Sequence, residues 1–367
     1  MKIPWYKPKY WGNEREYLLK AFDSTWISHG DYVDLLESNF SKILNSPYGV
    51  STSNGTTSLH LALLALEIGP GDEVIVPGFC FAGPINMILE VGAKPVFCDV
   101  EENTFLIDSS KIEELITKNT KAIMAVHTYG NVCEMNQINS IAKKYGLYVI
   151  EDAAEAIFSK YNGKYAGTFG DIGSFSFQAT KTITTGEGGM ALVADMGLRD
   201  KMKLIRNHGM GSKKYWHEGR AFNFRLTNLQ AALGVAQLEH KEAIERKRKE
   251  LYLLYQKNLG EAVLQEFKSE VTPCIWALAV KLTENREQVM NRLFEKGIET
   301  RPGFYSFFQM KRYRAPYLTN AEKLSRNIIL LPFYPDLKEE EIFSICEELK
   351  TYNFQMGQGK NKFPPLF

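Results

Sequence analysis

Short apolar segments alternate with amphipathic segments along the first half of the chain. Five β-branched, apolar runs are typical of buried strands and lie at 73–79, 94–100, 121–130, 147–156 and 188–194. Segments 109–119 and 135–146 place apolar residues at helical spacing and end in Asn or Gly, as helices do. This alternation predicts a mostly parallel sheet with helices on both faces, and such sheets bind ligands at the carboxyl ends of their strands.

The pattern changes after residue 225. A long helix of mixed charge is expected across 225–259, followed by one clear strand at 274–282 and by helices around 285–297 and 338–350. We therefore expect a large domain over residues 1–240 and a smaller α+β domain over residues 241–367, hinged by the long helix. The last residues, 357–367, are expected to be a loosely held extension.

Composition and charge narrow the classes of partner. Apolar residues make up 44% of the chain and charged residues 24%, which is ordinary for a soluble globular enzyme. With 44 basic and 43 acidic side chains the net charge is +1, so no global field favours nucleic acid or an anionic membrane. No segment reaches the roughly 18 to 20 apolar residues of a membrane span. Small molecules or a second copy of the chain are the expected partners.

The five cysteines point to a reducing compartment. They are odd in number and widely spaced, and none forms a CxxC pair. This spacing argues against a disulfide framework and against a zinc site. We expect no metal and a cytoplasmic protein.

A glycine turn between a short strand and a helix is the first candidate for chemistry. Asn54, Gly55, Thr56 and Thr57 form it. The unpaired backbone N–H groups and the positive end of the helix dipole at such a turn suit a phosphate. An ordinary N-cap with a tight turn has the same pattern, so both interpretations stay open.

Two further candidates follow predicted strands. Asp152 ends an apolar strand, where a buried carboxylate needs a cationic partner such as a protonated ring nitrogen. The alternatives are a solvated strand end or the N-cap of the next helix. Phe81 lies in a loop after a strand and is placed either to stack on a flat ring or to pack in the core.

The fourth candidate is a lone amine among small residues. Lys181 follows Ser176 by five residues, and Gly186, Gly188 and Gly189 allow a sharp backbone turn behind it. An amine becomes a nucleophile near neutral pH only where its surroundings favour the uncharged form. An exposed loop lysine is the alternative. Taken together and in this order, the four features are the parts of a pyridoxal phosphate site.

The chain resembles a known family over nearly its whole length. Segments 53–66, 69–77, 149–156, 167–190, 206–210, 222–234 and 297–302 resemble, in order and spacing, the sugar aminotransferases of the DegT/StrS family. The resemblance implies the fold-type I α/β architecture of pyridoxal 5′-phosphate enzymes. This architecture has a mostly parallel, mixed seven-stranded sheet between helices and a smaller C-terminal α+β domain. It also implies a homodimer with shared active sites.

The resemblance assigns roles to three residues of the reacting centre. Lys181 matches the lysine that bonds the cofactor, and Asp152 matches the acid that faces its pyridine nitrogen. Glu155 falls where the family places Gln, His or Glu beside the cofactor. Because residue 181 is a lysine, transamination is expected rather than the dehydration of relatives that carry His there.

The resemblance also implies how the cofactor is held. Phe81 falls at the position of the aromatic residue that stacks on the ring, and the amides of Gly55 and Thr56 with the hydroxyl of Ser176 match the phosphate-binding positions. Asn223 matches an asparagine that reaches the phosphate of the neighbouring subunit.

The resemblance implies L-glutamate as amino donor and a nucleotide-linked keto sugar as acceptor. Within the family the likeness is greatest to enzymes that act at C4 of a GDP-linked 4-keto-6-deoxyhexose for surface polysaccharides. A UDP- or dTDP-linked keto sugar and a small phosphorylated ketone stay open, as does a non-catalytic regulator that binds the cofactor. Substrate positions match six residues: Trp26, Ser28, His208, Tyr215, Arg301 and Tyr305.

Two departures from the family pattern fall near these positions. The loop before Gly30 is one residue shorter than usual. Ser306, Phe307 and Phe308 stand where relatives often read Pro, Leu and His. The exchange of an imidazole for a bulky ring bears on which sugar or nucleotide fits.

Overall fold

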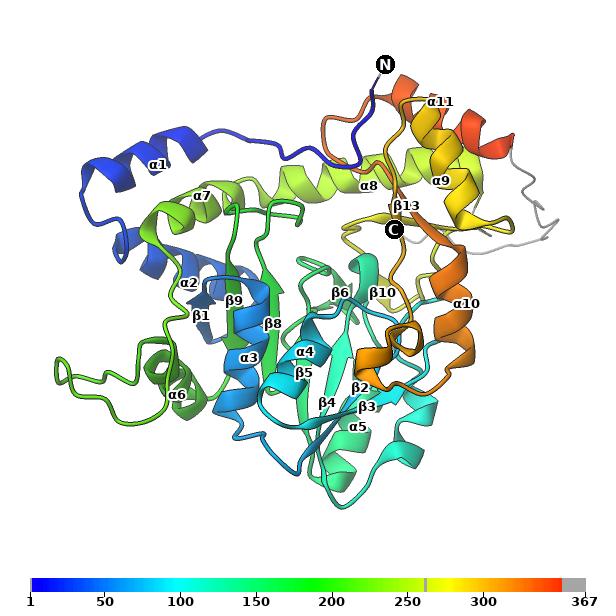
Figure 1. The fold of residues 1–367 in the computed structure, drawn as a ribbon. Coiled ribbons are helices and arrows are strands. Elements are labelled where there is room, and N and C mark those ends of the chain that lie inside the picture. Colours follow the sequence, from blue (N-terminus) through cyan, green and yellow to red (C-terminus); the bar gives the residue numbers. More distant parts are fainter. Residues whose placement is uncertain (1, 261–262, 352–367) are drawn as a thin grey trace.

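A seven-stranded sheet forms the centre of the molecule (Figure 1). The computed structural model describes residues 2–260 and 263–351. The strands follow the order β1-β9-β8-β5-β4-β2-β3. Their bounds are β1 Tyr48–Thr52, β2 Glu73–Pro77, β3 Lys94–Cys98, β4 Thr120–Val126, β5 Tyr148–Asp152, β8 Ile172–Ser176 and β9 Gly189–Val193. The five strands predicted from apolar runs are confirmed.

The sheet is mixed, and β9 is its antiparallel strand. Strands β8, β5, β4, β2 and β3 pair in parallel, and β9 runs antiparallel to both of its neighbours, β1 and β8. β1 therefore points the same way as the parallel strands. As a result, the carboxyl ends of β1, β2, β5 and β8 share one edge of the sheet, which is the edge where α/β sheets bind ligands.

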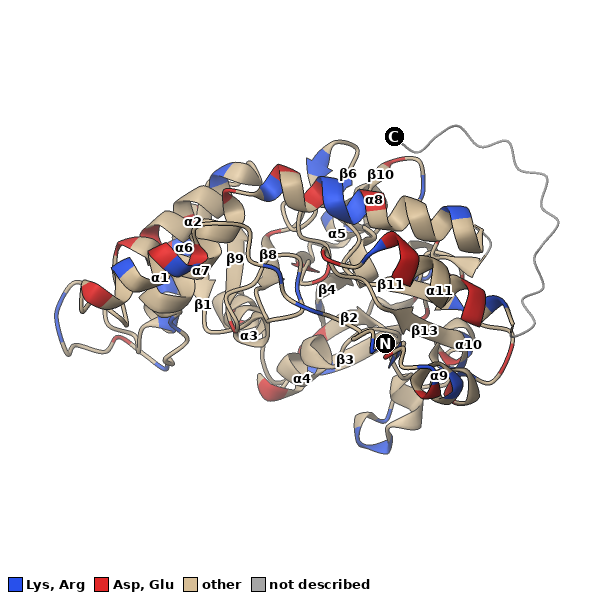
Figure 2. Cartoon of the chain, turned by 90° about the horizontal axis from the view of Figure 1, so that it is seen from above, with Lys and Arg blue, Asp and Glu red and all other residues tan. Residues whose placement is uncertain are grey.

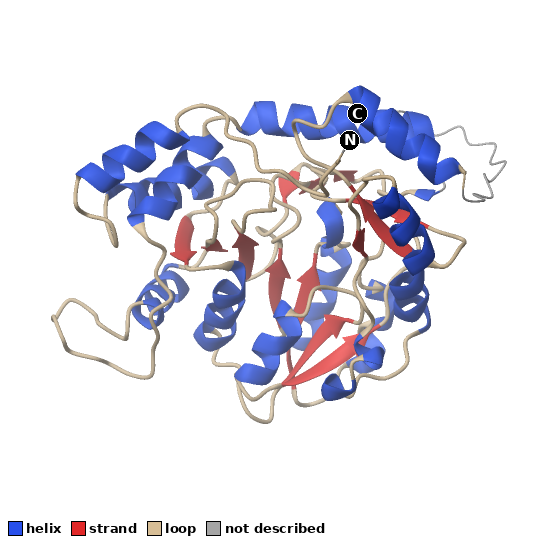
Figure 3. Cartoon of the chain, turned by 45° about the horizontal axis from the view of Figure 1, so that its top comes forward, coloured by secondary structure: helices blue, strands red, loops and turns tan. Residues whose placement is uncertain are grey.

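Helices cover both faces of the sheet, as the alternation of segments predicts (Figure 3). Val74 and Val76 of β2 pack in one core with α3 (Gly55–Ala65), α4 (Gly83–Glu90) and α6 (Met196–Arg206). Ile75, between them, packs in the other core with α5 (Met135–Tyr145) and α2 (Asp31–Ile43). Successive side chains of a strand point to opposite faces, so a continuous apolar run is buried on both sides.

The C-terminal part forms a second, smaller sheet. β11 (Leu278–Lys281), β13 (Ile328–Leu331) and β12 (Arg301–Pro302) pair in that order, all antiparallel. Helices α9 (Arg286–Glu295), α10 (Thr319–Asn327) and α11 (Glu339–Lys350) accompany them. The predicted strand at 274–282 and the helices near 285–297 and 338–350 are confirmed. The domain boundary at 240/241 stays a prediction, and the extension at 357–367 lies outside the described residues.

The N-terminal segment and a small third sheet tie the two parts together. Ile3 pairs with Ile298, and the backbone N–H of Phe333 donates to the carbonyl of Trp5. The third sheet joins β10 (Val271–Thr272), β6 (Lys160–Tyr161) and β7 (Lys164–Tyr165).

Basic and acidic residues both appear along the outer helices (Figure 2). None of the helices in 2–260 and 263–351 has the length and apolarity that crossing a bilayer requires.

The single long helix expected across 225–259 is wrong. The structure has two helices there, α7 (Asn228–Leu238) and α8 (Lys241–Leu259), which are separated at Glu239 and His240. α7 packs against α1 (Glu14–Asp23) and α2, whereas α8 packs against α11. The side-chain amide of Gln237 donates to the carbonyl of Lys9, which anchors the end of α7 to the N-terminal segment. Different packing partners therefore override the helical propensity of the junction.

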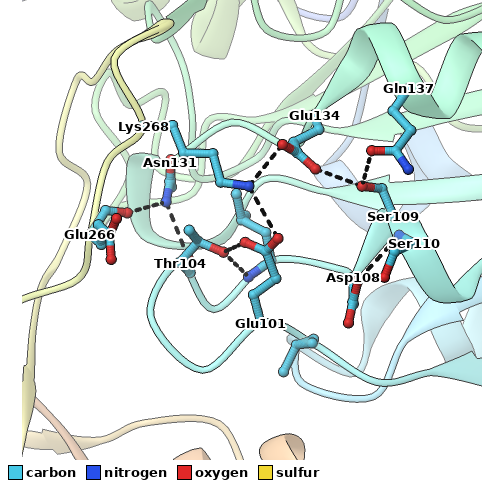
Figure 4. A network of polar contacts seen from close by, with 12 residues as sticks. Glu101, Thr104, Asp108, Ser109, Ser110, Asn131, Glu134, Gln137, Glu266 and Lys268 are labelled. Atoms are coloured by element: carbon cyan, nitrogen blue, oxygen red, sulfur yellow. Dashed lines mark hydrogen bonds and ion pairs between the residues drawn. The ribbon is translucent and has the colours of Figure 1, made fainter.

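The α-helix expected across 109–119 is also wrong, because the segment forms two single 3₁₀ turns, Ser109–Lys111 and Glu113–Leu115. Asp108 accepts from the backbone N–H of Ser110 at 3.1 Å, and the hydroxyl of Ser109 lies 2.6 Å from Glu134 (Figure 4). Side-chain bonds of Asp and Ser to nearby groups compete with helix formation. Apolar spacing alone cannot reveal this competition.

One buried carboxylate organises the loop that leads into β8. Glu151 accepts from the backbone N–H groups of Gly167 at 2.7 Å, Phe169 at 2.6 Å and Gly170 at 2.7 Å, and it lies 2.9 Å from His127 Nε2. His127 Nδ1 accepts from the backbone N–H of Cys133, so Nε2 carries the proton and donates to Glu151. Glu151 is fully buried, and its neighbour Asp152 belongs to the opposite face of the sheet.

This arrangement predicts a large effect of the isosteric change Glu151→Gln. The new amide presents N–H groups to two backbone or ring donors, which then lose their acceptor. We expect the free energy of unfolding in urea to fall by about 2–4 kcal/mol. Glu114→Gln, at an exposed position, is the matched control and should stay near the wild-type value. Equal stability of the two variants would contradict this role of Glu151.

Candidate active site

The residues singled out from the sequence come together at the carboxyl edge of the central sheet. Asp152 is the last residue of β5 and Ser176 is the last of β8, the parallel neighbour of β5. Gly55 opens α3 after β1, and Phe81 lies in the loop after β2. Four segments far apart in sequence therefore converge because the strands that precede them point the same way.

Lys181 lies beside an acid and an aromatic face. Its Nζ is 3.4 Å from Oε1 of Glu155 and 3.8 Å from the ring centroid of Trp276. The hydroxyl of Tyr6 donates to the carbonyl of Lys181 at 3.0 Å. The lysine side chain is only 13% exposed, so the alternative of an ordinary surface lysine is excluded.

Asp152 is a buried carboxylate with spare hydrogen-bonding capacity. Burial raises its pKa above the ordinary value, and the N–H bond from Ala154 and the charge of Lys181 oppose that rise. Within the described part of the chain, the backbone N–H of Ala154, at 3.1 Å, is its one hydrogen-bond donor. A carboxylate in such a place is stabilised by a cation, and a protonated ring nitrogen fits this need.

Glu155 completes a compact group of two acids and one amine. Its Oε2 accepts from the backbone N–H of Tyr129 at 3.0 Å, while Oε1 faces Lys181. Burial raises the pKa of Glu155, and the charge of Lys181 lowers it. Charged groups brought together at the buried edge of a sheet, with shifted pKa values, are typical of catalytic sites.

The glycine turn has the features of a phosphate site. The side chain of Asn54 accepts from the backbone N–H of Thr57, whereas the N–H groups of Gly55 and Thr56 have no acceptor among residues 2–260 and 263–351. A Cβ on Gly55 would lie 2.8 Å from Cβ of Ser176, so only glycine allows this approach. Two unpaired amides beside one hydroxyl at a helix N-terminus fit a phosphate group. The N-cap interpretation also holds, because Asn54 performs it.

Phe81 presents an aromatic face rather than filling the core. Its side chain is 61% exposed, which excludes the core-packing alternative. The ring lies near Gly83, at the start of α4, and its centroid is 6.3 Å from that of Phe304. An exposed ring at this edge of the sheet is available to stack on a flat ligand.

Asn223 lies between two rings that anchor its segment. The rings of Phe222 and Phe224 stack at 4.8 Å, and His60 of α3 lies against both, at 5.3 and 5.4 Å. The backbone N–H of Ser53 donates to the carbonyl of Phe224 at 2.8 Å, which fixes the segment to the phosphate turn. Asn223 itself is exposed, as the alternation of an extended chain requires.

The six residues predicted to contact the substrate lie at exposed positions: Trp26, Ser28, His208, Tyr215, Arg301 and Tyr305. None has a hydrogen bond or ring contact with Lys181 or Asp152 within the described chain, so their roles stay predictions. The loop that carries His208 and Tyr215 extends away from the body of the molecule (Figures 1 and 3). The loop before Gly30 is held by Asn228, whose amide donates to the carbonyl of Trp26 at 2.8 Å.

Trp276 and Tyr6 lie at the site although their sequence positions do not indicate it. Trp276 lies next to β11, in the C-terminal part, and Tyr6 lies in the N-terminal segment. Both contact Lys181, and neither belongs to a motif of the first half of the chain. Trp276 falls within the expected strand at 274–282 and Tyr6 near the N-terminus, and an aromatic residue in such a place is too common to single either out.

Comparison with known proteins agrees with this geometry. The model of the DegT/DnrJ/EryC1/StrS aminotransferase family matches residues 9–350. The chain is 43% identical to GDP-perosamine synthase of Escherichia coli O157:H7, over 95% of this chain and 98% of the relative. It is 39% identical to GDP-perosamine synthase of Vibrio cholerae, over 95% of this chain and 99% of the relative.

Solved structures support the same assignment. The fold is similar to the PLP form of the putative sugar aminotransferase Spr1654 from Streptococcus pneumoniae, with a TM-score of 0.91 and 27% identity over 96% of this chain and 98% of that one. DesV of S. venezuelae gives 0.90 and 27% over the same shares. The chain therefore belongs to the DegT/DnrJ/EryC1/StrS aminotransferase family and is a pyridoxal 5′-phosphate-dependent transaminase.

Proposed function

We propose that this transaminase moves the amino group of L-glutamate to C4 of a GDP-linked 4-keto-6-deoxyhexose, for the synthesis of a surface polysaccharide. The observation that carries the chemistry is the amine of Lys181, which is buried beside Glu155 in a group that also contains Asp152. The GDP-perosamine synthases of E. coli and V. cholerae support the choice of sugar, because they match this chain over nearly its full length.

The residues of the site divide the work between holding and proton transfer. The cofactor, when bound, supplies a ring that accepts electrons from the α-carbon of the amino donor. The amides of Gly55 and Thr56 with Ser176 would hold its phosphate, and Phe81 would stack on its ring. Asp152 would keep the ring nitrogen protonated. Lys181 Nζ would act as the base that removes the α-proton of glutamate, and it would then donate that proton to the cofactor as the acid that completes the transfer of the amino group.

The acceptor is tested by half-reactions. Glutamate should abolish the visible absorbance band of the loaded enzyme, and a keto acceptor should restore it. We expect the GDP-linked 4-keto-6-deoxyhexose to react at least about tenfold faster than its UDP- and dTDP-linked counterparts or a small phosphorylated ketone. In Lys181→Ala, glutamate should not abolish the band and a keto acceptor should not restore it. Lys118→Ala is the control and should behave like the wild type, because Lys118 is exposed just before β4, at the amino end of that strand and away from the site.

Two outcomes would contradict the proposal in different ways. A faster reaction with another acceptor would replace the sugar and leave the transaminase intact. A band that persists in glutamate would instead favour a regulator that binds the cofactor without turnover.

Asp152→Asn separates the catalytic from the structural effect of this acid. We expect a rate loss of roughly 10²-fold or more, since a neutral amide holds the ring proton poorly.

The cofactor-free Asp152→Asn protein should gain stability at about pH 7. Burial raises the pKa of Asp152 in the folded state, so its ionised form costs folding free energy above that pKa. The gain should shrink as the pH falls through this pKa, and urea unfolding across pH measures it. An active variant, or a less stable one at neutral pH, would show that Asp152 is only a capping residue.

We further propose a homodimer with shared active sites, in which Asn223 contacts the cofactor phosphate of the partner subunit. Three features support it: Asn223 is exposed, its segment is fixed by His60 and Ser53, and the loop before it extends from the body of the chain.

The buried, free state of all five cysteines supports a reducing compartment, and we propose the cytoplasm.

Mixed dimers test the shared site. In a dimer of one Lys181→Ala chain and one Asn223→Ala chain, one site carries both defects and the other carries neither. By two-fold symmetry, each mixed dimer should recover up to about half of the wild-type activity. Homodimers of Lys181→Ala should be inactive, and those of Asn223→Ala should lose cofactor more readily. A fully active monomer in sedimentation, or no recovery on mixing, would rule out the shared site.

A further inference from the structure

The amine of Lys181 lies in a cradle made by two groups from different parts of the chain. Glu155, which follows β5, contributes a carboxylate at 3.4 Å, and Trp276, which precedes β11, contributes the face of its indole ring at 3.8 Å. A cation over the face of a Trp ring is attracted by the ring quadrupole, most strongly where water is excluded. Trp276 is 7% exposed, so this contact is largely desolvated.

Hydrogen bonds hold the indole in place. Its Nε1–H donates to the carbonyl of Thr180 at 2.7 Å, and its backbone N–H donates to the carbonyl of Tyr129 at 3.3 Å. The buried Arg248 of α8 donates through Nη1 to the carbonyls of Ile275 at 2.9 Å and Trp276 at 3.1 Å. The bond to Thr180 is the important one, because it links the ring to the residue directly before Lys181.

Aromatic neighbours leave the indole little freedom to move. The ring of Tyr129 lies stacked against it at 6.2 Å, and Trp5 meets it edge-on at 6.1 Å. Tyr129 also donates its backbone N–H to Glu155, so one residue positions both walls of the cradle. The rotamer of Trp276 is thus fixed before the amine arrives, and little ordering cost opposes the contact.

We propose that Trp276 and Glu155 form a holding site for the amine of Lys181 in the cofactor-free chain and, during turnover, once this amine has taken up the α-proton, and that they hold it there as an ammonium ion. This inference rests on the role of Lys181 in transamination but not on the identity of the sugar. A transaminase frees this amine in each half-reaction, and the same amine must return. The cradle keeps it within reach and sets how readily it becomes the uncharged nucleophile.

Chemical labelling of Lys181 in the cofactor-free, full-length chain tests the proposal. N-Hydroxysuccinimidyl acetate reacts only with the uncharged amine, and mass spectrometry of the peptide gives the rate at Lys181. The rate at about pH 7 is divided by the plateau rate that the same variant reaches once a further rise in pH no longer speeds the labelling. This ratio cancels changes in access to the amine.

In Trp276→Leu the ratio should rise by about 2- to 30-fold over wild type, because the ammonium form loses the ring face. Trp276→Phe is the matched control, because Phe is similar in size to Leu but keeps an aromatic face. It loses only the N–H group of the indole, so its labelling ratio should stay closer to that of the wild type. Equal ratios in the wild type and both variants would overturn the proposal and leave Trp276 as a packing residue.

A second measurement decides the matter if Trp276→Leu fails to fold. Fluorinated tryptophan weakens the negative ring face with little change in shape. Its incorporation into the wild-type chain should raise the labelling ratio. The same incorporation into Trp276→Phe should not, which controls for the other four tryptophans. An unchanged ratio in the fluorinated wild-type chain would overturn the proposal.

Discussion

The rest of the active site depends on the burial of two carboxylates beside a single amine. Asp152 and Glu155 are both nearly inaccessible, and burial raises the pKa of each above its ordinary value. Charged groups are costly to bury unless they are paired, and the charge of Lys181 opposes the rise in pKa of both acids. The fold brings the ends of β5 and β8 together and places the amine of Lys181 against the ring of Trp276.

The two faces of β5 carry residues with different roles, one in the candidate active site and one that stabilises a loop. Asp152 belongs to the site, whereas Glu151, one residue earlier, binds three backbone N–H groups of the loop that leads into β8. The period of two in a strand makes this division possible in consecutive residues. A stable loop before β8 in turn fixes Ser176 at the end of that strand, near Gly55.

The sequence predicts local patterns well and contacts between distant segments poorly. The runs of β2 and β5 contain β-branched apolar residues and are followed by turns or loops, so their strands follow from the local sequence pattern. Segment 109–119 has helical spacing too, but Asp108 and Ser109 use their side chains in bonds that replace the helix. The turn at Gly55 and the acid at Asp152 could be singled out because each sits at a strand or helix end, and Lys181 because it is a lone amine in a loop of small residues. Trp276 could not, since its role arises from a contact with a loop 95 residues away.

The central claim is that Lys181 is the residue that bonds the cofactor, and one measurement tests it most directly. Borohydride reduction of the loaded, full-length enzyme makes the bond between lysine and cofactor permanent, and peptide mass spectrometry then locates it. The account predicts a single modified peptide that carries the cofactor on Lys181, and its loss when the enzyme is first treated with glutamate. Modification of a different lysine, or none in a protein that retains the cofactor, would contradict it.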